Sequence, residues 1–160
     1  MIYFYPELFY FGLNSFNIKR TIIENCMQYL KKIILPIFLA GVWINISETL
    51  RWEFLVKPYW LEFHQNLGIV LPQEPVNMII WMIWGFIFAT TIFIFSRKFN
   101  LWQTTFLSWF LLLVMLWVVL WNLNLLPVGI VPIAAPLGLI EAFVAAWICQ
   151  KLSPPKLDHA

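Results

Sequence analysis

Long apolar runs alternate with short polar breaks along this chain, and this pattern sets the expected architecture. Four such runs occupy residues 33–52, 77–96, 101–121 and 128–151. A helix rises ~1.5 Å per residue, so each run is long enough to cross the ~30 Å hydrocarbon core of a bilayer. The pattern predicts an all-α integral membrane protein with four transmembrane helices in an up-down bundle, forming one domain over residues 31–152.

The turn between the second and third runs indicates the orientation of the chain in the membrane. It reads Arg97-Lys98-Phe99-Asn100, with two cations and no acid, and short loops of this kind stay on the cytoplasmic side. Only two basic residues, Arg51 and Lys57, then lie on the outer side. The inner side carries Lys19, Arg20, Lys31, Lys32, Arg97, Lys98, Lys151 and Lys156. We predict a multi-pass protein of the cell (inner) membrane with both termini in the cytoplasm, including a polar tail of residues 153–160.

Two segments outside the apolar runs have a less regular pattern. In residues 51–75, Pro58 suits the start of a short helix and Gly68 its end, and aromatic residues make the stretch amphipathic. We expect an extracytoplasmic segment at the membrane surface between the first two spans. Residues 1–30 are rich in aromatic residues and predict an N-terminal interfacial segment. Alternatively, translation starts at Met27, and residues 1–26 are dispensable.

The composition fits a membrane environment and excludes some partners. Hydrophobic residues make up 62% of the chain, charged residues only 11%, and the mean hydropathy is +0.80. Soluble domains carry roughly 25% charged residues. No basic face is present, so we expect no nucleic-acid partner. We also expect no cofactor. We expect no metal site either, since Glu62 and His64, the candidate ligands, lie on different helical faces. The bilayer is the expected partner, together with a homo-oligomer or a second membrane protein.

The fourth run contains two prolines and a set of small residues. Pro132 and Pro136 interrupt its outer half, and a proline inside a helix removes one backbone hydrogen bond. We predict a helix that is kinked or broken near Pro136. Small residues follow on adjoining faces and suit close helix packing, namely Gly138, Ala142, Ala145 and Ala146.

Glu141 is the most informative polar residue because it lies deep in the fourth run. It is 14 positions from Pro127, which places it roughly 20 Å from the outer boundary. The same depth in the second and third runs corresponds to Thr90 or Thr91 and to Ser108, so we expect a layer of hydroxyls around the carboxyl group. An ionised carboxylate without a cation is costly at that depth, and we expect Glu141 to be largely protonated at neutral pH.

A second polar group lies near the outer end of the first run. Gly41, Asn45 and Glu48 share one helical face, with Arg51 three residues beyond, so this face should point into the bundle or a wet cavity. Glu48 is expected ~15 Å further out than Glu141, so that Arg51 pairs with Glu48 and does not reach Glu141. Two interpretations stay open: a site for a polar ligand or lipid headgroup, and a self-satisfied ion pair.

The apolar runs lack an evident catalytic set. Four spans with both ends inside resemble bacterial lipoprotein signal peptidases, but those enzymes depend on two intramembrane aspartates, and Asp158 in the tail is the only Asp here. We therefore favour a small non-enzymatic polytopic membrane protein that acts through membrane-protein or lipid partners. The alternative is a small proton- or cation-coupled transporter or channel subunit in which Glu141 titrates. Against this stands a structural role, in which protonated Glu141 ties the fourth helix to the second and third.

Overall fold

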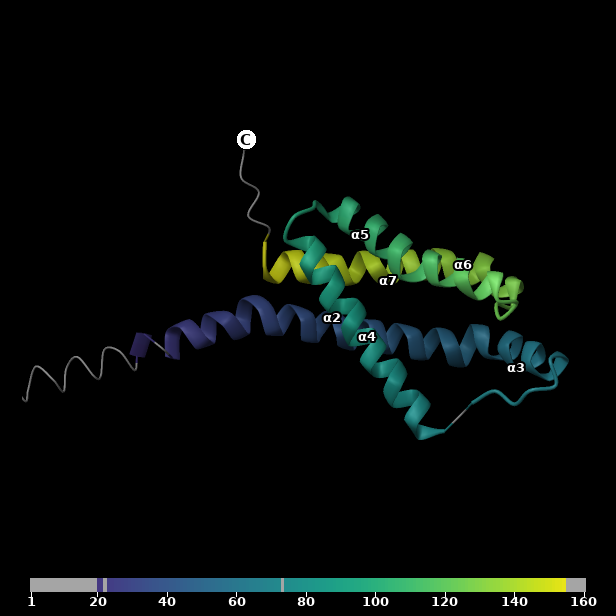
Figure 1. Cartoon of the computed structure of the whole chain (residues 1–160). Coiled ribbons are helices and arrows are strands. Elements are labelled where there is room, and N and C mark those ends of the chain that lie inside the picture. The colour runs from purple at the N-terminus through teal and green to yellow at the C-terminus, as the bar shows by residue number, and fades with distance from the viewer. Residues whose placement is uncertain (1–19, 22, 73, 155–160) are drawn as a thin grey trace, which may run out of the picture.

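A computed structural model describes residues 20–21, 23–72 and 74–154 of the chain (Figure 1). The described residues form helices joined by short turns, with no strand among them. Four helices are long and apolar enough to cross a membrane: Ile23–Asn66, Pro75–Ser96, Leu101–Asn122 and Val128–Leu152. Most of the N-terminal segment predicted to be interfacial, and most of the predicted tail, lie outside the described residues.

The first of these helices continues without a break for 44 residues, which corresponds to about 66 Å. It contains α2 (Leu35–Arg51) and α3 (Lys57–Asn66), each preceded by a π-helical turn, η1 (Leu30–Ile34) and η2 (Trp52–Val56). The short helix expected between Pro58 and Gly68 therefore exists, but as a direct extension of the first span. No separate segment begins at residue 51, where the sequence pattern placed the membrane boundary.

The two π-helical turns allow this helix to pass two prolines. Pro36 and Pro58 each lie in the first turn of the α-helix that follows a π-helical turn. In η2 the Lys57 N–H donates to the Trp52 carbonyl five residues earlier, so this turn accommodates one extra residue. A proline ring clashes with the carbonyl four residues before it, and a wider turn relieves that clash.

The remaining helices form a hairpin and a final span. They are α4 (Pro75–Ser96), α5 (Leu101–Trp109), η3 (Phe110–Val114), α6 (Met115–Asn122), the 3₁₀ turn η4 (Val128–Ile130) and α7 (Val131–Leu152). Helix α7 runs on through Pro136, so the break considered for this position is absent. We call the end of the molecule that holds residues 97–100 the turn end, and the end that holds residues 67–74 and 123–127 the loop end.

The core lies between α2, α4, α5 and α7. The predicted packing residue Gly138 is buried, and the three alanines Ala142, Ala145 and Ala146 have no exposed surface. They pack in one cluster with Ile44 of α2 and Phe88 of α4, among others. The small-residue surface of α7 is therefore used within this chain and is not available to a partner.

Helices α2 and α4 cross where each has a glycine. A Cβ added to Gly41 of α2 would lie 2.4 Å from Cδ1 of Phe86, and one added to Gly85 of α4 would lie 2.5 Å from Nδ2 of Asn45. Each glycine thus provides the space for a side chain of the other helix. The Asn45 amide also donates to the carbonyl of Met82 at 3.4 Å, which links the two helices by a hydrogen bond.

From this crossing toward its first residue, α4 diverges from the other helices (Figure 1). The half of α4 nearest the turn end buries Phe88, Ala89 and Ile92. In the half at the loop end, by contrast, every residue from 78 to 83 is exposed, including Met78 (68%) and Trp81 (60%). This half of α4 therefore presents apolar side chains on all faces and buries none of them.

The turn end is held together by side-chain hydrogen bonds. The guanidinium Nη1 of Arg97 donates to the carbonyl of Ser153 at 2.9 Å, to its hydroxyl at 2.7 Å and to the carbonyl of Pro154 at 2.8 Å. Gln150 donates to the carbonyl of Phe99 at 2.9 Å. The turn between α4 and α5 is thus fastened to the end of α7.

Candidate functional site

Three charged side chains from two helices meet between α2 and α7. Nη2 of Arg51 donates to Oε1 of Glu48, one turn earlier in the same helix. Nη1 of Arg51 lies 3.4 Å from Oε2 of Glu141 across the interface. Arg51 is 8% exposed and Glu141 0%, whereas the side chain of Glu48 is 30% exposed. We refer to these residues as the Glu48–Arg51–Glu141 cluster.

The prediction that Arg51 does not reach Glu141 is wrong, and the length of the first helix explains the error. The prediction took residue 52 as the outer end of the first span, but the helix continues through α3. The ring of Tyr59 in α3 lies beside Gly129, at 3.3 Å from a Cβ added there. Arg51, two turns earlier, lies beside Gly138, with Nη1 3.7 Å from an added Cβ. Arg51 is therefore deeper along the bundle than expected.

Gly138 provides the space that the Leu113 side chain occupies, next to the guanidinium of Arg51. A Cβ at this position would also lie 2.7 Å from Cδ1 of Leu113 and 3.8 Å from Cδ1 of Trp109. Any larger residue would crowd the contact of α7 with η3, whereas its Cβ would lie at ordinary van der Waals distance from Arg51. The glycine expected to serve helix packing thus allows α7 to pack closely against η3 beside the charge cluster.

The cluster has unused hydrogen-bonding groups. Both carboxyl oxygens of Glu141 and Nη1 of Arg51 are buried and have no hydrogen-bond partner within the described part of the chain. The Ser47 hydroxyl lies near the Glu141 carboxyl group. Buried polar groups in proteins are nearly always paired. The cluster therefore has donor and acceptor capacity for a further small polar species.

Two tryptophans hold the backbone of α7 on either side of the cluster. Nε1 of Trp43 in α2 donates to the carbonyl of Glu141 at 3.1 Å, and Nε1 of Trp109 in α5 donates to the carbonyl of Ala135 at 3.0 Å. The sequence interpretation did not single out either residue. Their position in the middle of apolar runs, away from the membrane boundaries where Trp usually lies, was the available signal.

Asn45, Thr90 and Thr91 lie in α2 and α4 but not in the cluster. Asn45 bonds to Gly41 of its own helix at 2.8 Å, in addition to its contact with α4. Thr90 and Thr91 donate to carbonyls of their own helix at 2.8 and 3.0 Å, and Thr90 is exposed. Each hydroxyl is thus bonded within α4, and no hydrogen bond links either threonine to Glu141.

Ser108 is fully buried in α5, and its hydroxyl has no hydrogen-bond partner among the described residues. The α5 to α7 register follows from the Trp102 to Phe143 ring contact at 5.1 Å and the Trp109 bond to residue 135. In this antiparallel register Ser108 lies near the level of residue 137, about one turn toward the loop end from Glu141. Ser108 therefore lines the same interface without a bond to the carboxyl group.

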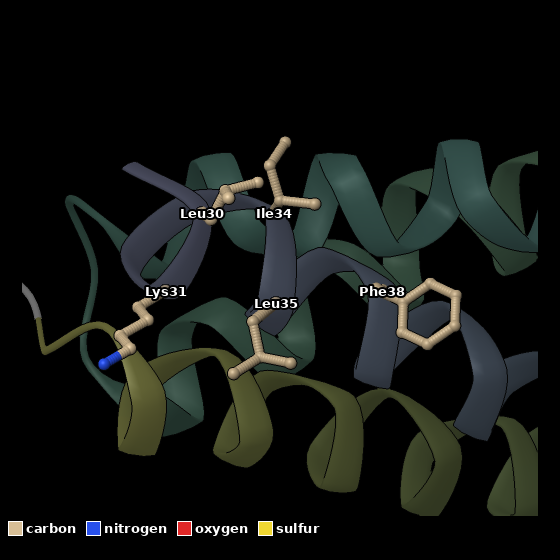
Figure 2. A pocket seen from close by; sticks show the side chains of 5 residues that line it. All are labelled: Leu30, Lys31, Ile34, Leu35 and Phe38. Atoms are coloured by element: carbon tan, nitrogen blue, oxygen red, sulfur yellow. The ribbon is translucent and has the colours of Figure 1, made fainter. Parts of the chain in front are cut away.

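Two surface hollows lie away from the cluster. The first hollow is on the side of the first helix at the turn end, and all of its lining residues come from that helix. Figure 2 shows all five of them: Lys31 and Leu35 are directed to the side where α7 lies, and the other three are Leu30, Ile34 and Phe38. The second hollow lies between α3 and residues 69–72 and 74. None of the residues predicted as functional lines either hollow.

No protein family, curated protein or solved structure matches this chain. Four apolar helices of sufficient length indicate a helical multi-pass membrane protein. Within the described residues, no group of three His, Cys, Asp or Glu side chains is placed to hold a metal ion. The charge cluster and the exposed half of α4 are therefore the features from which a function can be argued.

Proposed function

We propose that this chain is a non-enzymatic membrane protein that acts by binding the helix of another membrane-protein chain along the loop-end half of α4. The observation that carries this proposal is the exposure of α4 around its whole circumference from residue 78 to 83. The rest of the helix packs closely through Gly85 and the buried residues beyond it. One half of α4 thus packs against other helices of the chain, and the other half does not.

The physical reason is that packing, not the hydrophobic effect, drives helix association in lipid. A helix that diverges from its neighbours gives up van der Waals contacts, and lipid chains must fill the wedge. The residues that line this half include Met78, Trp81 and Met82, and Met and aromatic residues are enriched at protein interfaces. A partner helix seated against α4 would restore the missing contacts.

We also propose that the four helices cross the cell membrane with the turn end in the cytoplasm, because the basic residues gather there. The natural cysteines provide a test, since Cys26 is exposed at the turn end and Cys149 is buried. A membrane-impermeant maleimide should label Cys26 in inverted vesicles but not in right-side-out vesicles, and should not label Cys149 in either. Labelling of Cys26 from the outside would reverse the proposed orientation.

Site-specific photo-crosslinking in native membranes tests the proposed interface. A photoreactive residue at Ile80, which is 59% exposed, should give a defined protein adduct whose partner is retained in native mass spectrometry. Val118 of α6 is 50% exposed and serves as the matched control, which should react only with lipid. An adduct at the mass of two copies would identify a homo-oligomer as the partner. Lipid adducts alone at both positions would refute the proposal.

The alternative function is a small proton- or cation-coupled transporter or channel subunit that uses Glu141. Its support is the Glu48–Arg51–Glu141 cluster, in which two carboxylates surround one guanidinium. Substitution of Glu141 by Gln keeps the shape of the side chain but removes its charge. A flux assay in proteoliposomes should lose its pH or cation dependence in this variant if the alternative is correct, and should be unchanged if Glu141 is only structural.

A further inference from the structure

The Glu48–Arg51–Glu141 cluster has more acidic than basic groups. Arg51 contacts both carboxyl groups, one through each terminal nitrogen. If both carboxylates are ionised, the cluster has a formal charge of −1. Because Glu141 has no exposed surface and Arg51 only 8%, this excess charge would be largely shielded from water.

The neighbouring elements provide no second cation. Residues 75–96 of α4 and 101–122 of α5 to α6 contain no charged residue. In α7 the other charged residue is Lys151, ten positions from Glu141 and so about 15 Å away. Beyond the cluster on the first helix, Lys57 pairs with Glu53 at 2.8 Å. Within the described part of the chain, Arg51 is thus the single cation that contacts the two carboxylates.

We propose that the cluster binds one proton, which Glu48 and Glu141 share on either side of Arg51. The proton would reduce the net charge of the cluster to zero. It would also provide a donor at a site where both oxygens of Glu141 have no hydrogen-bond partner among the described residues. Glu48, the one partly exposed member, is the group through which the proton exchanges with the surroundings. This inference does not depend on the partner proposed for α4.

Sharing predicts a behaviour that independent titration of Glu141 does not. Two carboxyl groups coupled through one cation titrate as a unit. Replacing either of them with Gln leaves one carboxylate and one guanidinium, which is a neutral pair that needs no proton. The proton should therefore be lost in both single variants. If Glu141 were protonated independently of Glu48, Glu48→Gln would leave that proton in place.

Infrared spectroscopy of the whole chain in lipid nanodiscs can measure this proton. Carboxyl groups in water ionise well below neutral pH, so the C=O stretch of a protonated carboxyl at pH 7 reports the cluster. The expected result is a band equivalent to one carboxyl in the wild-type protein and no band in Glu48→Gln or Glu141→Gln. Glu53→Gln, in the exposed pair with Lys57, is the matched control and should keep the full band.

Other results would overturn the proposal. Absence of the band from the wild-type protein at pH 7 would mean that the cluster holds no proton. A band that survives Glu48→Gln but not Glu141→Gln would assign the proton to Glu141 alone. A band that appears only when sodium is replaced by a large organic cation would identify an alkali-ion site. If Glu141→Gln does not fold, Glu48→Gln still decides whether the proton is shared or is bound by Glu141 alone. Glu48 is the more exposed residue, so its substitution should disturb folding less.

Discussion

Removal of the Arg51 side chain is the most direct test of the charge cluster. Arg51→Met keeps much of the apolar stem but leaves Glu48 and Glu141 without their cation. Breaking a buried ion pair by removing one partner costs about 3–5 kcal/mol of stability, because a charge stays buried and uncompensated. Since Glu48 is 30% exposed, we expect a loss near the lower end, about 3 kcal/mol. The loss should shrink as the pH falls, because protonation of both carboxyl groups removes the buried charge.

The free energy of unfolding in mixed detergent micelles measures this effect. The double variant Arg51→Met/Glu141→Gln should be more stable than Arg51→Met alone, because the deeper carboxylate is then neutral. Lys57→Met removes the cation of an exposed pair and serves as the control, with an expected loss of about 0.5 kcal/mol or less. The reasoning is refuted if Arg51→Met costs less than about 1 kcal/mol, or if its effect and that of Glu141→Gln add to within about 0.5 kcal/mol.

Three further substitutions test other parts of the structure. Gly41→Ala should cost about 1–3 kcal/mol in the same unfolding assay, because the added methyl meets the Phe86 ring, and Gly41→Ala/Phe86→Leu should recover most of the loss. Arg97→Ala should speed hydrogen exchange in the last turn of α7 and leave exchange in the rest of the helix unchanged, because it removes the bonds to Ser153. Equal exchange in the wild-type protein and the variant would count against this link. Gly68→Ala should destabilise by about 1–2 kcal/mol through its φ of +69° alone, since an added Cβ meets nothing within 4 Å, and a neutral result would show that the turn relaxes.

The apolar runs predicted the number of long helices because in such a sequence length and composition leave few alternatives. The face defined by Gly41, Asn45 and Glu48 was expected to turn away from lipid, and it does contact α4 and the charge cluster. These features depend on periodicity within one helix, which a sequence displays directly. Membrane insertion and the orientation of the termini stay predictions.

Features that depend on how two helices are placed along each other could not be predicted. The pairing of Arg51 with Glu141 was missed because the prediction ended the first span at residue 52, whereas pairing allows charged residues to lie deeper. The tie between Arg97 and Ser153 joins residues 56 positions apart, and neither has a pattern that points to the other. The divergence of α4 is equally invisible in its sequence, since an apolar helix has the same composition whether it faces protein or lipid.

The fastening of α4 at one end only gives this helix an unequal response to the thickness of the bilayer. Its turn-end half is held by the Arg97 bonds and, near the middle of the helix, by the glycine crossing with α2, while its other half contacts no neighbour closely enough to bury a side chain. Transmembrane helices adjust to hydrophobic mismatch mainly by tilting. In thin membranes the free half of α4 should lean outward, and in thick ones it should stand more upright against the first helix. The width of the wedge, and with it the room for a neighbouring helix, would then follow the lipid composition of the membrane.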